Sequence, residues 1–377
     1  MQSNEPMTPK ERWLAAIQMK PLDRLPFWPK LDAAYPRVQV APFRAMSLDA
    51  LHDWIGSDQH IWIAACFKAV HKRTAEETTI QNNLRRTVYR TPDGEMELVS
   101  RFDEASQSWH PREFPVRSRE DIRRMTAFYE DMDVELDREA LQRTREQVAQ
   151  IGQEALTATA IGESPLMYWV EWLAGVEMAH YLLADYPDEV ETLFAAMHQV
   201  LLKKTEILAE HSPVDVLYMT ENTSTTLISP QQYRLYCKRH IADYGQIAHK
   251  YGRPLVLHMC GHLKALLPDL ATLPVEAFEA FTSPTLGNTT LLDGRGGCPD
   301  KCLIGGTNVM LWLRPAGEII AQIERDLAAL PHHRGIAVTS AGVMTPFCQP
   351  ETIREVCEWV KGYAVRLGSS DKTSSAA

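Results

Sequence analysis

A chain of 377 residues can form one large domain or two ordinary ones, and 45% hydrophobic and 23% charged residues are typical of a globular protein. The net charge of −10 and the lack of a long Lys/Arg run argue against a nucleic-acid partner. The N-terminus lacks the pattern of a signal peptide, and no apolar run is long enough to span a membrane, so we expect a cytoplasmic protein without membrane contact.

The cysteine content indicates reduced thiols. Seven cysteines, an odd number, are spread over a long chain, which is not the pattern of a disulfide framework. In a reducing compartment, a thiol close to other polar side chains is a candidate for metal binding or catalysis.

Two helix starts are clear near the N-terminus. Thr8 can cap a helix that has a proline at its first position and Glu11 at its third, which is a capping box. A shorter helix is expected over residues 47–56, which begin with a serine and end with a glycine.

Residues 24–32 form an irregular extended segment between these helices. Its prolines are best tolerated at the edge or the end of a strand. Lys30 and Asp32 lie where the segment stops, and a solvated loop is the favoured interpretation of both.

Residues 78–116 have a different pattern from the rest of the chain. Two alternating runs flank Pro92-Asp93-Gly94, and Asp-Gly supplies the positive φ that a tight hairpin turn needs. We therefore predict an inserted β-hairpin over residues 78–116 that acts as a lid or a partner-contacting flap.

The remaining sequence alternates between strand-like and helix-like segments. Strand-like runs occur at 155–161, 214–219, 254–257, 277–281, 302–304 and 335–339, and the clearest helices are at 177–208, 230–251, 263–273 and 315–330. Together with one or two strands before residue 70, this order predicts an α/β fold, a (β/α)8 TIM barrel. We expect one domain over residues 1–377, with an N-terminal helical extension and a disordered tail at 368–377.

His258 and Cys260 stand where the apolar run 254–257 ends. Side chains alternate along a strand, so a His-x-Cys spacing can direct an imidazole and a thiol to one face, and these are ligand types that zinc prefers. A core histidine beside a buried thiol is the plainer alternative.

Other strand ends carry polar residues of the same kind, and in a barrel these ends meet at one face. Glu279 and Cys348 are further candidate metal ligands, with a paired buried carboxylate and an ordinary loop thiol as their alternatives. Glu221 is a candidate ligand, a substrate-binding acid or a residue that orients His258. The polar residues at the same ends also include Asn222 and Asn308.

Two further groups have plainer explanations. Cys298 and Cys302 are a rival thiol pair, but the turn that precedes the strand places them at the opposite face of the barrel. The aromatic cluster at 167–172 is typical of a helix core, and a substrate wall is the alternative.

These residues resemble the uroporphyrinogen decarboxylase-like superfamily, and within it the corrinoid-dependent methyltransferase branch. The resemblance covers nearly the whole chain, through segments 8–12, 23–26, 228–230, 258–261, 299–306 and 345–351, and His-x-Cys-Gly at 258–261 is its most specific part. The decarboxylases carry an Arg-rich motif near the N-terminus, where this chain has Leu31-Asp-Ala-Ala-Tyr35, so the resemblance disfavours porphyrinogen decarboxylation.

The resemblance implies a zinc enzyme that moves a methyl group between a small corrinoid (methylcobalamin) protein and a carrier, in the demethylation of methyl compounds. Tetrahydrofolate is favoured as the carrier over a thiol such as coenzyme M. Zinc ligands carry over onto His258 and Cys260. The family's third ligand, a Cys after the last strand, is replaced by Ala341, so Cys348 or Glu279 is expected to take that role.

With folate as the carrier, N5 must be protonated or polarised, and Glu221, Asn222 and Asp32 are the candidate catalytic residues. Asn308 and Trp28 are candidates for binding the cofactor. The expected partners are the corrinoid protein and the small-molecule carrier, and a homodimer is left open. Two alternatives remain: a metal-free decarboxylase or lyase that acts on a small acid, and a non-catalytic module that holds a methylated corrinoid protein.

Overall fold

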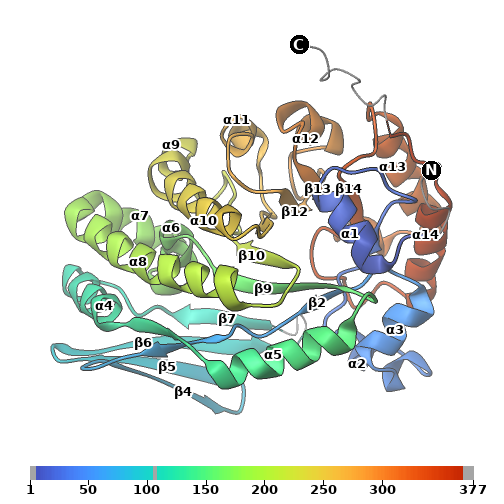
Figure 1. Cartoon of the computed structure of the whole chain (residues 1–377). Coiled ribbons are helices and arrows are strands. Elements are labelled where there is room, and N and C mark those ends of the chain that lie inside the picture. Colours follow the sequence, from blue (N-terminus) through green and yellow to red (C-terminus); the bar gives the residue numbers. More distant parts are fainter. Residues whose placement is uncertain (1–5, 105–107, 368–377) are drawn as a thin grey trace.

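The computed structural model describes residues 6–104 and 108–367, in which eight parallel strands form a nearly closed barrel (Figure 1). The predicted tail at 368–377 lies outside the described residues. The sheet order is β1-β14-β13-β12-β11-β10-β9-β2. The bounds are β1 Phe27–Trp28, β2 His60–Trp62, β9 Leu156–Gly162, β10 Val216–Thr220, β11 Leu255–His258, β12 Ala277–Phe281, β13 Cys302–Gly305 and β14 Ile336–Thr339. This architecture confirms the predicted TIM barrel.

The strands from β9 to β14 are largely buried on both faces, which explains why they appear in the sequence as short, nearly continuous apolar runs. All residues of β12, β13 and β14 are buried. Each of the six predicted runs coincides with a strand to within two residues at either end.

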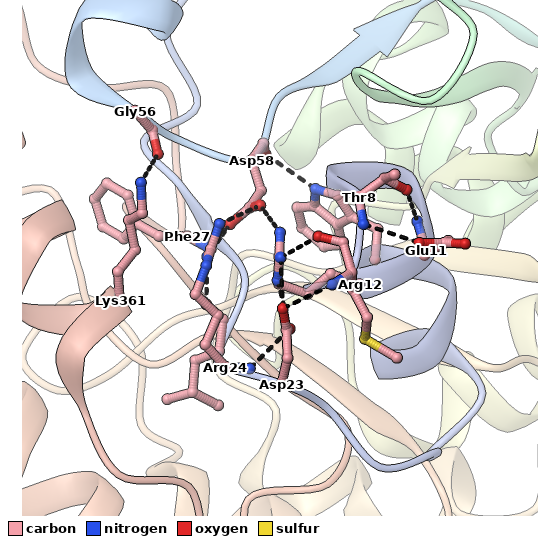
Figure 2. Close-up of polar contacts among 12 residues, drawn as sticks. Thr8, Glu11, Arg12, Asp23, Arg24, Phe27, Gly56, Asp58 and Lys361 are labelled. Carbon is pink, nitrogen blue, oxygen red and sulfur yellow. Dashed lines mark hydrogen bonds and ion pairs between the residues drawn. The ribbon is translucent and has the colours of Figure 1, made fainter. Parts of the chain in front are cut away.

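Asp58 joins the two ends of the sheet, β1 and β2 (Figure 2). Its amide donates to the carbonyl of Phe27 at 2.8 Å, and its carboxylate accepts the amide of Phe27 at 3.0 Å. Arg12 and Arg24 each place a guanidinium nitrogen 2.6 Å from the same carboxylate, which is fully buried. Two cations, one backbone hydrogen bond and one hydrogen bond from the Phe27 amide to the Asp58 side chain therefore hold the segment before β2 against β1.

Both N-terminal helices form as predicted. Helix α1 (Pro9–Ile17) has the complete capping box of Thr8 and Glu11. Helix α3 (Leu48–Ile55) is capped by Ser47 and ends at Gly56, whose φ of 78° a residue with a side chain would adopt only with strain.

The predicted helix at 177–208 is two helices, α7 (Val176–Asp185) and α8 (Pro187–His211). The break falls at Tyr186, because a proline disfavours helical geometry in the residue before it and lacks an N–H to continue the ladder. The remaining helices of the barrel are α2 Tyr35–Val38, α6 Pro165–Tyr168, α9 Pro230–Gln232, α10 Arg239–Lys250, α11 Leu267–Leu270, α12 Leu291–Gly297, α13 Ala316–Ala328 and α14 Pro350–Gly362.

The insertion between β2 and β9 is larger than the hairpin predicted over 78–116. The turn at Pro92-Asp93 does join two antiparallel strands, but these belong to a four-stranded sheet with the order β4-β5-β6-β7. Strand β4 has every side chain exposed, so it lacks the apolar alternation by which a half-buried strand is recognised. The bounds are β3 Phe67–Val70, β4 Ala75–Gln81, β5 Leu84–Thr91, β6 Gly94–Asp103, β7 Ser108–Glu113, α4 Arg119–Asp131, β8 Asp133–Leu136 and α5 Arg138–Ile151.

Candidate active site at the carboxyl ends of the strands

The centre of the candidate site is a buried contact between neighbouring strands. His258 ends β11 and Glu279 lies in β12, and Nδ1 of His258 contacts Oε2 of Glu279 directly. Lys30, just beyond β1, places Nζ 2.8 and 3.0 Å from the two carboxylate oxygens and 3.4 Å from Nδ1 of His258. The hydroxyl of Tyr218 in β10 also donates to Glu279. The carboxylate therefore meets a cation, an imidazole and a phenol.

The charges of this cluster depend on one another. Burial opposes ionisation of Glu279 most strongly, but Lys30 and His258 outweigh it and hold the pKa of Glu279 well below its usual range. Burial alone would lower the pKa of His258, whereas the Glu279 carboxylate raises it above the ordinary value. The cluster thus favours a carboxylate at Glu279 over a wide pH range.

Cys260 is exposed at the mouth of the barrel, two residues beyond His258. Its sulfur lies 3.7 Å from Oδ1 of Asn222, and its side chain also interacts with His258. The loop can take this path because residue 261 is glycine: a Cβ there would overlap the side chain of Ser224. His258 and Cys260 therefore share one side of the β11 end, as a common ion would require.

Cys348 has different surroundings. It is 2% exposed, its thiol lies 3.8 Å from the carbonyl of Gln349, and its own carbonyl accepts the hydroxyl of Tyr35. Burial raises the pKa of the Cys348 thiol to about 12, which disfavours the thiolate form that binds metals. Its assignment as a ligand stays a prediction to which these contacts lend no support.

The side chains at this site match zinc in the type of their donor atoms but are not arranged around a metal ion. Among residues 6–104 and 108–367, no three His, Cys, Asp or Glu side chains are arranged to hold a metal ion. The nitrogen, sulfur and oxygen donors of His258, Cys260 and Glu279 nonetheless match zinc in chemical type and lie at adjoining strand ends. Lys30 supplies the positive charge at Glu279 in this arrangement.

The side chain of Glu221 is held by Ser164, in the loop after β9, and does not face the mouth of the barrel. It is fully buried and accepts the amide of Ser164 at 2.9 Å and its hydroxyl at 2.6 Å. Burial raises the pKa of Glu221 to about 7 despite these bonds. Its backbone amide donates to the carbonyl of His258, so it supports the β11 end through the main chain.

The other predicted residues lie around the mouth. Asp32 accepts the amides of Ala34 and Tyr35 and so stabilises the start of α2. Trp28 lies beneath Lys30, whose Nζ is 5.7 Å from the ring centroid. These residues line a hollow of about 360 Å³ beside β2.

Asn308 connects the loops after β12 and β13. Its amide donates to the hydroxyl of Ser283 at 3.0 Å and to the carbonyl of Pro284 at 2.8 Å. These bonds give Asn308 a structural role. The rival thiol Cys302 opens β13 and so lies at the other end of the barrel from Cys260, as expected.

Sequence reasoning missed a pair of acids near Cys260. Glu171 accepts from Nδ2 of Asn222 at 3.0 Å and has its other oxygen buried without a hydrogen-bond partner. Both oxygens of Glu163 lie 3.2 Å from the indole nitrogen of Trp172. Burial and then the charge of Glu171 raise the pKa of Glu163 to about 9, and burial also raises that of Glu171.

Glu163 stands two residues after the predicted strand at 155–161 and directly follows β9, so a search for polar residues at strand ends could have found it. Glu171 lies within the aromatic cluster at 167–172, which combines buried core residues such as Trp169 with the half-buried Trp172. Lys30 was interpreted as a loop residue, and only its contact with Glu279 reveals its place in the site.

Two general properties can be stated for the described part of the chain. No helix within it is long and apolar enough to cross a membrane. All seven cysteines lie in it, and none of them forms a disulfide there.

The parallel barrel is a TIM barrel, and its polar residues gather at the carboxyl ends of the strands, where TIM-barrel enzymes have their active sites. The chain belongs to the uroporphyrinogen decarboxylase (URO-D) family, whose model matches residues 110–363. That match contains β9 to β14 and therefore His258, Cys260 and Glu279, whereas Lys30 lies before it.

One solved structure shares the fold of this barrel. A methyltransferase from Methanosarcina mazei is similar over 94% of this chain and 99% of its own, with a TM-score of 0.57 and 15% sequence identity, which shows a shared fold. A putative vitamin-B12 independent methionine synthase from Listeria monocytogenes covers 59% of this chain and 68% of its own, at a TM-score of 0.37 and 11% identity. No curated protein sequence matches the chain significantly.

Proposed function

We propose that the protein is a zinc-dependent methyltransferase that moves a methyl group between a small corrinoid protein and tetrahydrofolate in the cytoplasm. The observation that carries this proposal is that His258, at the end of β11, contacts both the carboxylate of Glu279 in β12 and the side chain of the exposed Cys260. Membership of the URO-D family and the fold shared with a methyltransferase also support a methyltransferase function.

His258, Cys260 and Glu279 would hold the zinc. For Glu279 to act as a ligand, the ammonium group of Lys30 must leave the carboxylate, which now has both oxygens bonded to it. Bound zinc would supply a Lewis acid at the mouth of the barrel. Cys348 is not needed for this arrangement.

Glu171 and Asn222 would take part in proton transfer at the methyl carrier. Asn222 lies between the sulfur of Cys260 and the carboxyl group of Glu171. Methylation of tetrahydrofolate at N5 releases a proton, and a carboxylate whose pKa is raised by burial is a better acceptor for it, which supports folate as the carrier. Glu221 and Asp32, both engaged in local hydrogen bonds, would support the site rather than transfer protons.

Metal analysis of protein purified without oxygen tests the zinc assignment. We expect about one zinc per chain in the wild type and in Cys348→Ala, and a loss of zinc in Cys260→Ala and Glu279→Gln. Zinc-free wild-type protein would contradict the proposal, and so would full retention in Cys260→Ala.

A transfer assay tests the carrier. Methylcobalamin is supplied as the donor, and its absorbance is followed after addition of either tetrahydrofolate or coenzyme M. Demethylation with tetrahydrofolate alone is expected, and transfer to coenzyme M alone would replace folate by a thiol carrier.

One observation favours a second candidate, a metal-free decarboxylase or lyase that acts on a small acid. Lys30 places a buried ammonium group beside a hollow of about 360 Å³, where it could bind a substrate carboxylate. This function would require a zinc-free protein that releases carbon dioxide from a small carboxylic acid, with activity lost in Lys30→Met.

A further inference from the structure

A second cavity lies away from the His258–Glu279 contact. It is enclosed by the inserted sheet, α4, α8 and the end of β9, and its volume is about 170 Å³. An open cleft of about 400 Å³ between α4 and α8 lies next to it, with Tyr129, Met132 and Val200 forming walls of both.

Three tyrosines from different elements line this cavity: Tyr89 in β5, Tyr129 in α4 and Tyr168 in α6. The side chain of Tyr168 interacts with those of both Tyr89 and Tyr129. Three hydroxyl groups carry three protons, and hydrogen bonds from Tyr89 and Tyr129 to Tyr168 would use two of them. One proton and several lone pairs are left for another partner.

The hydroxyl groups stay protonated at neutral pH. Burial raises the pKa of Tyr168 to about 12, and it raises those of Tyr89 and Tyr129 further. The cluster can therefore donate one hydrogen bond and accept others, which is the pattern that complements a hydroxyl group.

Part of the remaining wall suits a single apolar ring, and Glu76, Glu163 and Lys204 complete the lining. Phe128, Met132, Met197 and Val200 contribute hydrocarbon and thioether surface. An apolar cavity of about 150 Å³ binds one benzene ring, so this cavity has room for one ring and no more. The charged Lys204 is held over the ring of Phe67, with its Nζ 5.2 Å from the centroid.

We propose that this cavity is a binding site for a small single-ring phenol, with the phenol hydroxyl at the tyrosine cluster and the ring against the apolar wall. The site does not depend on the proposed methyl transfer. Glu163 also lines the cavity and, through Trp172, belongs to the acid pair near Cys260. It is the residue through which an occupied cavity would contact the candidate active site.

Isothermal titration of the full-length protein with phenol and, separately, with benzene tests this site. Phenol is expected to bind at one per chain and about tenfold more tightly than benzene, since a hydrogen bond to a buried hydroxyl cluster is worth about that factor. Equal affinity for the two ligands, or no phenol binding up to its solubility limit, would overturn the proposal.

Two tyrosine variants locate the binding. Tyr168→Phe keeps the ring and removes the central hydroxyl, so the preference for phenol over benzene should fall to within about twofold. Tyr251→Phe is the matched control, because its hydroxyl bonds to Glu206 on the surface of α8. An equal loss in the control would also overturn the proposal. Tyr129→Phe replaces Tyr168→Phe if thermal unfolding shows that the latter does not fold, and zinc content reports on the other site independently.

Discussion

The ammonium group of Lys30 lies 2.8 Å from Oε1 of Glu279, although 249 residues separate the two in the chain. The contact crosses the mouth of the barrel from the end of β1 to β12. Lys30 has a φ of 51°, in the left-handed region that residues with a side chain seldom adopt. An unusual backbone geometry at this position is consistent with a residue held there by its partner.

Replacing Lys30 by Met should destabilise the zinc-free protein. Glu279 is fully buried, and removal of its cation leaves a charge with incomplete compensation, so the free energy of unfolding is expected to fall by about 3 kcal/mol. Urea denaturation measures this change, with the exposed Lys20→Met as the control. Equal stability of the two variants would show that Tyr218 and His258 suffice to hold the carboxylate.

Asp58 should be among the most sensitive positions outside the site. Asp58→Ala removes the bond to the amide of Phe27 and leaves the guanidinium groups of Arg12 and Arg24 without this partner. We expect a loss of about 3 to 5 kcal/mol in the free energy of unfolding. The exposed Asp53→Ala should change it by less than about 0.5 kcal/mol. A mild effect of Asp58→Ala would contradict the role of Asp58 in joining β1 to β2.

The acid Glu163 should make stability depend on pH. The pKa of Glu163 in the folded protein, about 9, lies above its ordinary value. At pH values between these two pKa values, the folded state therefore binds more protons than the unfolded state. The stabilisation is complete below about pH 4 and is lost as the pH rises towards 9, at up to about 1.4 kcal/mol per pH unit.

Glu163→Gln carries no such proton, so its unfolding free energy should fall less than that of the wild type between pH 5.5 and 8.5. Urea denaturation at both pH values gives the comparison, and the exposed Glu154→Gln serves as the control. Parallel pH profiles for wild type and Glu163→Gln would show that Glu163 ionises normally.

Gly261 should tolerate no side chain. In Gly261→Ala, the new Cβ would overlap Ser224, so the loop that carries Cys260 must move, at a cost of about 1 to 3 kcal/mol. We expect a lower unfolding midpoint and weaker zinc retention. Gly342→Ala, at the same mouth, has nothing within 4 Å of its Cβ and should behave like the wild type. Wild-type zinc retention in Gly261→Ala would disprove the steric argument.

Local signals in the sequence were sufficient to determine the barrel and part of the site. Buried parallel strands are apolar on both faces, so the six runs from 155 to 339 were visible without knowledge of their neighbours. The same signals placed His258 and Cys260 at a strand end, and residue 279 inside a strand beside it. Helix α1 was determined by its own capping residues.

Only the tertiary structure decided which side chains meet. Lys30 reaches Glu279, and Glu171 reaches Asn222, because barrel closure brings distant loops to one mouth, and no local pattern encodes that approach. Burial, which sets the pKa of Glu163 and the inertness of Cys348, also depends on neighbours from other elements. A sequence records the direction of a side chain relative to its own strand, whereas contacts across the barrel depend on how all eight strands are placed.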